Sequence, residues 1–330
     1  MTDRVSPVPT NQAKKLARRV SILQHRVLPL MALLFIAVTV SAISSPYFLT
    51  PENLQVLITA FFVELAIVAI GQTLVILVRG IDLSVGGNLA LSAITVGYFY
   101  KQGTDISVAM GLGLLVGLTC GFLNGMLVTL FRTPAMIATL ATGLLFNGIA
   151  QGITSGRPFS SFPESYQALG QGFLGPIPVQ LMILLVLATL THTILTRTRF
   201  GRQVYAVGGN PLAAKFSGIH INRVTMLMYM GSGLMAAIAG IVASARLLAA
   251  GPLLSTGVEL GSITAVLLGG VSVAGGEGTV FEALVGMLVI AVIRSGMTLA
   301  GVTQTIQLTT VALVLLGICI VNLRLARIRV

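Results

Sequence analysis

Long apolar runs recur along most of this 330-residue chain and limit what it can fold into. An α-helix needs roughly 20 predominantly apolar residues to cross the hydrocarbon core of a bilayer. In lipid every backbone N–H and C=O group must be paired within the protein, which a helix achieves on its own. The sequence predicts about ten transmembrane helices, near residues 27–45, 55–78, 86–100, 107–131, 135–154, 178–196, 224–245, 259–274, 280–299 and 305–323. The expected fold is an all-α, polytopic integral membrane protein.

The composition agrees with this fold and excludes several functions. Hydrophobic residues make up 55% of the chain and charged residues 9%, whereas soluble domains carry about 25% charged residues. This argues against a soluble enzyme, a disordered scaffold and, despite the net charge of +11, a nucleic-acid binder. We expect a basic cytoplasmic tail over residues 1–26, one transmembrane domain over 27–323 and a second cytoplasmic tail over 324–330.

The positions of lysine and arginine predict the orientation of the spans. With the N-terminus inside, 16 of these residues fall in inner segments, while Arg294 lies within a span and Lys101, Arg157 and Arg246 fall outside. Short cytoplasmic loops of membrane proteins carry an excess of basic residues. We therefore expect both termini in the cytoplasm, with residues 155–177 outside and residues 197–223 inside.

The inner loop 197–223 carries the pattern of a short helix. Pro211 after Asn210 suits a first helical turn, and Gly218 suits the helix end. The apolar face of this helix consists of Leu212, Ala213, Ala214 and Phe216. A short amphipathic helix can dock into a groove on a cytosolic partner, or it can rest on lipid headgroups. The spacing of the residues leaves both interpretations open.

Two glycine-rich breaks, residues 79–87 and 269–279, interrupt the spans near the expected inner face. Non-helical backbone persists at membrane depth only where protein or a water-filled cavity surrounds it. Broken helices of this kind often line transport pathways. We expect a gate built from Gly80, Asp82, Ser84, Gly86, Gly275, Gly276 and Glu277.

The sequence lacks the common signatures of catalysis. It has no phosphate-binding loop with a Gly-Lys pair and no His-Glu-x-x-His motif, and these would hold nucleotide phosphates or zinc. We therefore expect no enzyme activity, no metal site and no cofactor bound by this chain.

Polar residues within the spans leave three functions open. Glu64 is the acid placed deepest in a predicted span, as an ion-coupled secondary carrier would require. Hydroxyl and amide groups are more numerous, and they either hydrogen-bond a polyhydroxylated solute or join helices to one another. We expect Asn124, Asn147 and Gln151 to line a solute pathway. The third possibility is a membrane scaffold subunit without a pathway.

Three long motifs resemble one known family. They are the Gly-Ile-Asp-Leu-Ser-Val-Gly run at 80–86, the inner-loop residues 197–202, 205–210 and 217–219, and the segments 267–272 and 275–279. Their order and spacing over residues 50–322 are similar to those of permease subunits of bacterial monosaccharide ABC importers. This is the ribose-type permease family, which is related to the branched-chain amino acid permeases.

The resemblance implies a permease subunit of the bacterial inner (plasma) membrane. Its partners would be cytosolic ABC ATPase subunits that bind ATP and Mg, a periplasmic solute-binding protein and a second permease copy or paralogue. The solute would be a sugar or a similar small polar molecule. The resemblance also implies that the inner-loop helix is the coupling helix, with coupling residues Arg199, Gly201, Pro211, Ala213, Ala214, Ser217 and Gly218.

The chain departs from the family pattern at three positions. Arg79 and Glu282 stand where the family usually has glycine, and Gly261 stands where an acid is frequent. These departures leave the class of protein intact and put the identity of the solute in doubt.

Overall fold

The computed structural model describes the backbone of residues 11–328 and the side chains of residues 28–317. The elements are α1 (Asn11–Ser44), α2 (Pro51–Val56), the π-helix η1 (Leu57–Phe62), α3 (Val63–Leu77), α4 (Val85–Lys101), α5 (Ile106–Thr129), α6 (Ala135–Thr154), β1 (Phe159–Ser160), α7 (Glu164–Gln171), β2 (Phe173–Leu174), β3 (Ile177–Pro178), α8 (Val179–Arg197), α9 (Arg199–Gly209), α10 (Pro211–Phe216), α11 (Ile221–Leu247), β4 (Ala249–Ala250), the 3-10 helix η2 (Pro252–Ser255), α12 (Val258–Leu268), α13 (Val280–Leu299) and α14 (Gln304–Ile328).

The structure confirms an all-α, multi-pass membrane protein. Within the described residues, six helical segments are long and apolar enough to cross a membrane: Pro51–Leu77, Ile106–Thr129, Ala135–Thr154, Val179–Arg197, Ile221–Leu247 and Val280–Leu299. Three shorter segments are also apolar: Leu28–Ser44, Pro252–Leu268 and Gln304–Gly317. The count of ten spans stays a prediction.

One predicted boundary is wrong. The eighth span was expected over 259–274, but α12 ends at Leu268. Gly269 and Gly270 follow, and Gly270 adopts a φ of +101°, which glycine accepts without steric cost and which interrupts a right-handed helix. The helix therefore ends where the glycine-rich break was predicted to begin, at residue 269, and only the predicted span end at residue 274 is wrong.

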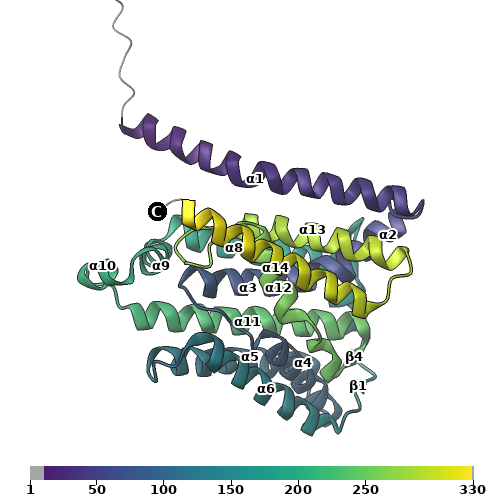
Figure 1. Cartoon of the computed structure of the whole chain (residues 1–330). Helices are drawn as coiled ribbons and strands as arrows, with labels where there is room; N and C mark the ends of the chain where they lie inside the picture. The colour runs from purple at the N-terminus through teal and green to yellow at the C-terminus, as the bar shows by residue number, and fades with distance from the viewer. Residues whose placement is uncertain (1–10, 329–330) are drawn as a thin grey trace, which may run out of the picture.

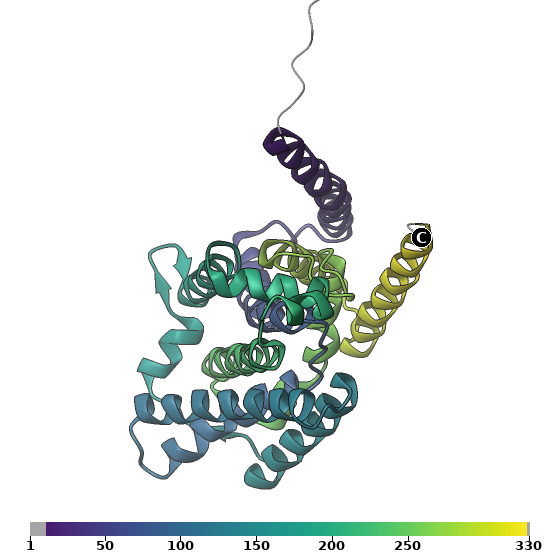
Figure 2. The ribbon, with the colours of Figure 1, turned by 90° about the vertical axis from the view of Figure 1, so that its left-hand side faces the viewer.

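Helix α11 is central to the packing. It packs most extensively against α5, α3 and α4, and Figure 2 shows α1 and α14 at the periphery of the molecule. The elements define two ends in Figure 1. We call the end with α9 and α10 the loop end, and the end with β1 and β4 the strand end. Helix α1 begins and α14 ends on the side of the loop end (Figure 1).

The segment 155–177 is more structured than a simple outer loop. Strand β1 pairs antiparallel with β4, and β2 pairs with β3. Helix α7 packs against α11: the Tyr166 hydroxyl donates to the Ile241 carbonyl oxygen at 3.1 Å and lies 2.6 Å from Ser244 Oγ. This segment thus covers the strand end of α11.

The basic residues separate between the two ends, as the predicted orientation requires. Lys101 ends α4, Arg157 precedes β1, and Arg246 lies in the last turn of α11, all at the strand end. The basic residues of the inner loop 197–223 lie on and around α9 and α10 at the loop end. Which end faces the cytoplasm stays a prediction.

Small residues bring α5 and α11 into backbone contact. A Cβ atom added at Gly121 would collide with the Tyr229 carbonyl oxygen, and one added at Gly117 would lie 2.8 Å from the Gly233 carbonyl oxygen. Small residues at helix interfaces in membranes let backbones approach closely, and dispersion contacts then stabilise the pair.

We predict that Gly121→Val destabilises the protein by about 1–3 kcal/mol, because the atoms that an added side chain would meet belong to the backbone of α11 and cannot rotate away. The measurement is the midpoint of thermal unfolding in detergent, followed by size-exclusion chromatography. Gly111→Val on the same helix is the matched control, because a Cβ atom at Gly111 meets no atom within 4 Å. Equal midpoints for the two variants would contradict this packing.

Candidate functional site

The first break spans residues 78–84 between α3 and α4, so residues 85–87, which the sequence placed in the break, begin α4 instead. A buried carboxylate holds this break in place. Asp82 Oδ1 accepts hydrogen bonds from the Ser84 amide at 2.9 Å and the Ser84 hydroxyl at 2.7 Å. Asp82 Oδ2 accepts from Ser232 Oγ of α11 at 2.9 Å. Gln72 of α3 donates through Nε2 to the Asp82 carbonyl oxygen at 2.7 Å. The break is thereby tied to both α3 and α11.

The same network continues into α5 and α6. Asn124 Nδ2 donates to Ser84 Oγ at 2.6 Å, and Thr142 Oγ1 donates to Asn124 Oδ1 at 2.6 Å. Asn124, predicted to line a pathway, is fully buried here. Its amide finds partners on both sides within the packed helices, in the same network as the predicted gate residues Asp82 and Ser84.

Three consecutive residues at the start of α4 each pack against a different neighbour. A Cβ atom at Gly86 would collide with the Glu259 carboxylate of α12, and one at Gly87 would lie 2.5 Å from the Gly143 carbonyl oxygen of α6. Asn88 Nδ2 lies 3.2 Å from the carbonyl oxygens of Gly117 and Gly233. The two glycines therefore allow a close approach of backbones that larger residues would prevent.

The second break meets the first at the loop end. Gly275 and Gly276 adopt φ angles of +79° and +72°, which favour glycine. The Gly276 amide donates to the carbonyl oxygen of Leu77, the last residue of α3, at 2.9 Å. The Ser272 amide donates to the Glu277 carbonyl oxygen at 3.0 Å and closes the turn.

Helix α9 joins both breaks at the same place. Arg79 donates through Nε to the Gly208 carbonyl oxygen at 2.6 Å and through a terminal nitrogen to that of Gly209 at 2.7 Å. Tyr205 donates to the Gly278 carbonyl oxygen at 2.9 Å. We call residues 77–79, 205–209 and 275–278 the coupling junction. It links the inner loop directly to the backbone of both predicted gate segments.

Two local effects stabilise this junction. Burial, and secondarily the negative charge of Glu282, raise the pKa of the Tyr205 phenol above its ordinary value, which favours the protonated hydroxyl that donates to Gly278. Glu282 itself is the third residue of α13, where it forms a capping box with Thr279. A capping box pairs two otherwise unpaired amides at a helix start, which gives this departure from the family pattern a structural role.

The helix predicted after Asn210 is present as α10. Asn210 Oδ1 accepts from the Ala213 amide at 3.0 Å, and Gly218 follows the helix with a φ of +79°. Pro211 occupies the first turn, as expected. We did not predict α9 from the sequence, because its glycines and arginines are typical of a polar loop rather than of an amphipathic helix.

The predicted coupling residues separate into exposed and buried groups. Arg199, Ala213, Ser217 and Gly218 are exposed and Pro211 is half-buried. Ala214 is only 3% exposed, and a Cβ atom at Gly201 would collide with the Leu195 carbonyl oxygen of α8. A large residue at Gly201 or a charge at Ala214 would therefore disturb the fold of the loop itself, so these changes are poor tests of partner docking.

The most exposed apolar residues of α10 are ones that the coupling assignment omitted. Leu212 is 64% exposed and Phe216 is 82% exposed. The amphipathic pattern placed both residues on the apolar face. It could not tell which members of that face pack inward, because this depends on where α9 and α11 lie.

The other two predicted pathway residues lie on α6, apart from Asn124. Asn147 Nδ2 donates to Ser255 Oγ of η2 at 3.2 Å. Gln151 is exposed one turn further along, with its Nε2 atom 3.5 Å from Asn147 Oδ1. These residues form a partly open polar surface at the contact of α6 with η2.

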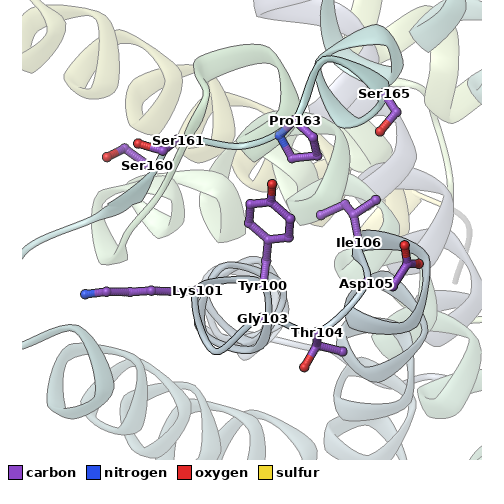
Figure 3. A pocket seen from close by; sticks show the side chains of 10 residues that line it. All are labelled: Tyr100, Lys101, Gly103, Thr104, Asp105, Ile106, Ser160, Ser161, Pro163 and Ser165. Carbon is purple, nitrogen blue, oxygen red and sulfur yellow. The ribbon is translucent and has the colours of Figure 1, made fainter.

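An open pocket of about 630 Å³ lies at the strand end, between the α4–α5 turn and residues 160–165. Figure 3 shows the Tyr100 ring projecting into it between the two segments. Asp105 on its rim caps α5, and the hydrogen bond from the Ser107 amide holds the pKa of this carboxyl below its usual value. The pocket carries hydroxyl groups and charges of both signs.

Glu64, the predicted deep acid, has a cationic partner. Arg246 Nε lies 2.6 Å from Glu64 Oε1, and a terminal nitrogen lies 3.2 Å from Oε2. Arg246 lies in the last turn of α11, where its charge complements the helix dipole, whereas Glu64 lies within the continuous helical segment Pro51–Leu77. The pair ties the strand ends of two central helices together.

Comparison with known proteins points to one family. The family described as branched-chain amino acid transport system / permease component matches residues 54–322. The chain is 38% identical to the ribose import permease protein RbsC of Bacillus subtilis, over 86% of this chain and 88% of that protein. It is 39% identical to RbsC of Escherichia coli K12, over 87% and 90% of the two chains.

A more distant relative is the D-allose transport system permease protein AlsC of Escherichia coli K12, at 36% identity over 81% and 82% of the two chains. No solved structure matches the chain. These relatives are transport permeases rather than enzymes, and they do not support the ion-coupled carrier that the position of Glu64 suggested. The pairing of Glu64 with Arg246 gives that acid a structural role instead.

We predict that Glu64→Gln lowers stability by about 1–3 kcal/mol, because it leaves the half-buried Arg246 guanidinium without its counter-charge. The double variant Glu64→Gln/Arg246→Gln should be less destabilised than the single variant. Unfolding midpoints in detergent measure both effects, with the exposed Glu52→Gln as control. If the double variant keeps its stability but no longer takes up solute, Glu64 has a role in transport and the structural assignment is wrong.

Proposed function

This chain belongs to the family of the branched-chain amino acid transport system permease component, and we propose that it is the transmembrane permease subunit of an ATP-driven ABC importer. The solute is a monosaccharide or a similar small polar molecule, as the similarity to the ribose and D-allose permeases suggests. The observation that carries the proposal is the coupling junction. It connects α9 of the inner loop to the first break through the hydrogen bonds from Arg79 and to the second break through the hydrogen bond from Tyr205.

In this proposal the loop end is cytoplasmic and the protein lies in the bacterial inner membrane. The charge distribution supports this orientation, because the basic inner loop lies at the loop end. Both termini are then cytoplasmic, and the ten predicted spans, including the short α4 and α12, cross the membrane or enter it. The chain binds no cofactor, and ATP and Mg belong to the partner ATPase.

The cytosolic ABC ATPase docks on α10. Leu212 and Phe216 present an exposed apolar surface there, and an amphipathic helix lying in a groove buries such residues in its partner. The alternative, in which α10 rests on lipid headgroups, uses the same side chains. The direct contact of the neighbouring α9 with both breaks favours the ATPase, because it would transmit a force applied at α10.

The transport cycle follows from these contacts. ATP-driven closure of the ATPase subunits moves α10 and α9 as a unit, since Asn210 both ends α9 and caps α10. The movement reaches the first break through Arg79 and the second through Gly276. The breaks act as the gate, and Asn147 and Gln151 line the pathway.

The remaining partners lie on other surfaces of the chain. A periplasmic solute-binding protein delivers the solute to the strand end, where the pocket beside Tyr100 and the ordered segment 155–177 form the surface. A second permease copy or paralogue completes the pathway.

We predict that Phe216→Glu reduces co-purification of the ATPase subunit at least about tenfold, because it puts a charge into an apolar groove. The measurement is detergent extraction of the tagged chain with quantitative mass spectrometry of the bound ATPase. Phe216→Leu keeps the apolar contact and should retain the partner.

Phe173→Glu makes the same substitution on exposed β2, at the strand end, and is the matched control for the added charge. If Phe216→Glu binds as much ATPase as Phe173→Glu, the docking assignment is wrong. If none of these chains binds an ATPase under several detergents, the importer proposal itself fails.

A further inference from the structure

Glu259 is an acid in the shorter apolar segment Pro252–Leu268 that the coupling and gate assignments do not use. It lies in the first turn of α12, and its carboxylate touches Gly86 in the first turn of α4. At 1.5 Å per residue, Gly86 lies roughly 22 Å from the strand end of α4, and Glu259 roughly 14 Å from the end of α12 at the second break. Both distances place the carboxylate well inside a hydrocarbon core about 30 Å thick.

No cationic side chain within the described residues forms an ion pair with Glu259. Glu64, in contrast, is paired with Arg246. Charged groups within membrane spans pair with one another or face a water-filled cavity, and they mark solute pathways. Glu259 is only partly buried. An unpaired, partly exposed carboxylate at this depth therefore requires water or a polar ligand beside it.

The surroundings of Glu259 belong to the same polar surface as the pathway candidates. The Ser255 carbonyl oxygen lies 2.9 Å from the point where a Gly86 Cβ atom would stand, next to the Glu259 carboxylate. The Ser255 hydroxyl donates to the Pro252 carbonyl oxygen at 2.8 Å and accepts from Asn147. It thereby fixes the orientation of the Asn147 amide, whose oxygen lies beside Gln151.

Glycine at position 86 is what allows this arrangement. Any side chain there would displace the Glu259 carboxylate and the Ser255 backbone, and thus separate α12 and η2 from α4. The neighbouring Gly87 permits the backbone of α6 to approach, with the Gly143 carbonyl oxygen 2.5 Å and the backbone nitrogen of Asn147 3.3 Å from an added Cβ. The glycine pair therefore brings Glu259 of α12 and Asn147 of α6 to one site.

We propose that Glu259, Asn147 and Gln151 form the solute-contact site of the pathway, with Glu259 as the residue that determines specificity for vicinal hydroxyl groups. This rests on the proposed importer function. A carboxylate has two oxygens and accepts hydrogen bonds from two adjacent hydroxyls at once, whereas amides both donate and accept. A sugar offers both kinds of partner, and no cation or proton needs to accompany it.

Water access tests the location without knowledge of the solute. In a chain with Cys120→Ala and Cys319→Ala, Glu259→Cys should react with a membrane-impermeant, positively charged methanethiosulfonate reagent in everted membrane vesicles with the ATPase present. Reaction should occur in at least one of two conditions, with ATP or without it. Val186→Cys, which is exposed on α8 away from this surface, is the lipid-facing control and should stay unmodified. An unreactive Glu259→Cys in both conditions would overturn the proposal.

Uptake tests the role of the carboxylate. With radiolabelled D-ribose and D-allose as probes, Glu259→Gln should raise the KM for uptake roughly tenfold, since a charge-assisted hydrogen bond becomes a neutral one. ATPase co-purification should be unchanged. The KM of Glu259→Asp, which keeps the charge, should lie between the KM of the unaltered chain and that of Glu259→Gln. An unchanged KM, or uptake that loses a sodium dependence on substitution, would contradict solute contact.

The two experiments separate this inference from the proposed function. If the unaltered chain binds its ATPase but Glu259→Cys is unreactive, the importer stands and the solute site is wrong. If the unaltered chain binds no ATPase, the importer fails, and labelling at position 259 then reports only a water-filled cavity.

Discussion

The rest of the structure depends on Asp82, a buried carboxylate that no cation neutralises within the described residues. Hydrogen bonds from Ser84 and Ser232 solvate its charge in place of water. A buried charge without such partners is strongly unfavourable, so the first break has little freedom to adopt another conformation. Because Ser84 also binds Asn124, and Asn124 binds Thr142, the carboxylate fixes α3, α4, α5, α6 and α11 around one point. A pathway that opens and closes needs such a fixed base beside its moving parts.

In the proposed transport cycle, the segments that move meet this base at the coupling junction. Arg79 stands where the resemblance to the family leads us to expect glycine, and its φ of +66° lies in the left-handed region that glycine favours. The guanidinium of Arg79 compensates for this strained backbone with two hydrogen bonds to the end of α9. The departure from the family pattern is therefore local: it keeps the backbone shape of the break and adds a link to the coupling loop. Glu282 behaves similarly, since it retains the turn and caps α13.

Much of this arrangement could be predicted from the sequence, because it depends on apolar runs and turn residues. The spans, the two breaks and the helix after Pro211 follow from local signals. The contacts that determine the role of each polar or apolar side chain do not follow from local signals. In the sequence, Asn124 and Asn147 are equivalent polar residues on adjacent spans. In the structure, Asn124 is fully buried among helices, whereas Asn147 is partly exposed at an open surface. The Glu64–Arg246 pair joins residues 182 positions apart, and no local pattern reveals it. Ala214 and Phe216 share an apolar face, and only the position of the neighbouring helices shows which of them a partner can reach.

The central claim is that the coupling loop controls the gate through the contact of α9 with both breaks, and Gly208→Val tests it most directly. A Cβ atom at Gly208 would collide with the Leu77 carbonyl oxygen and the Gly276 amide, whereas one at Gly209 meets no atom within 4 Å. Because this collision is with backbone, as at Gly201, the unfolding midpoint and ATPase co-purification are measured beside uptake, and Tyr205→Phe, which removes only the hydrogen bond to Gly278, is the milder variant. In the reconstituted importer both variants should hydrolyse ATP while solute uptake per ATP falls, about tenfold for Gly208→Val, a coupling loss of order 1–2 kcal/mol. Gly209→Val should transport normally. Uptake per ATP in Gly208→Val and Tyr205→Phe equal to that in Gly209→Val would contradict the account.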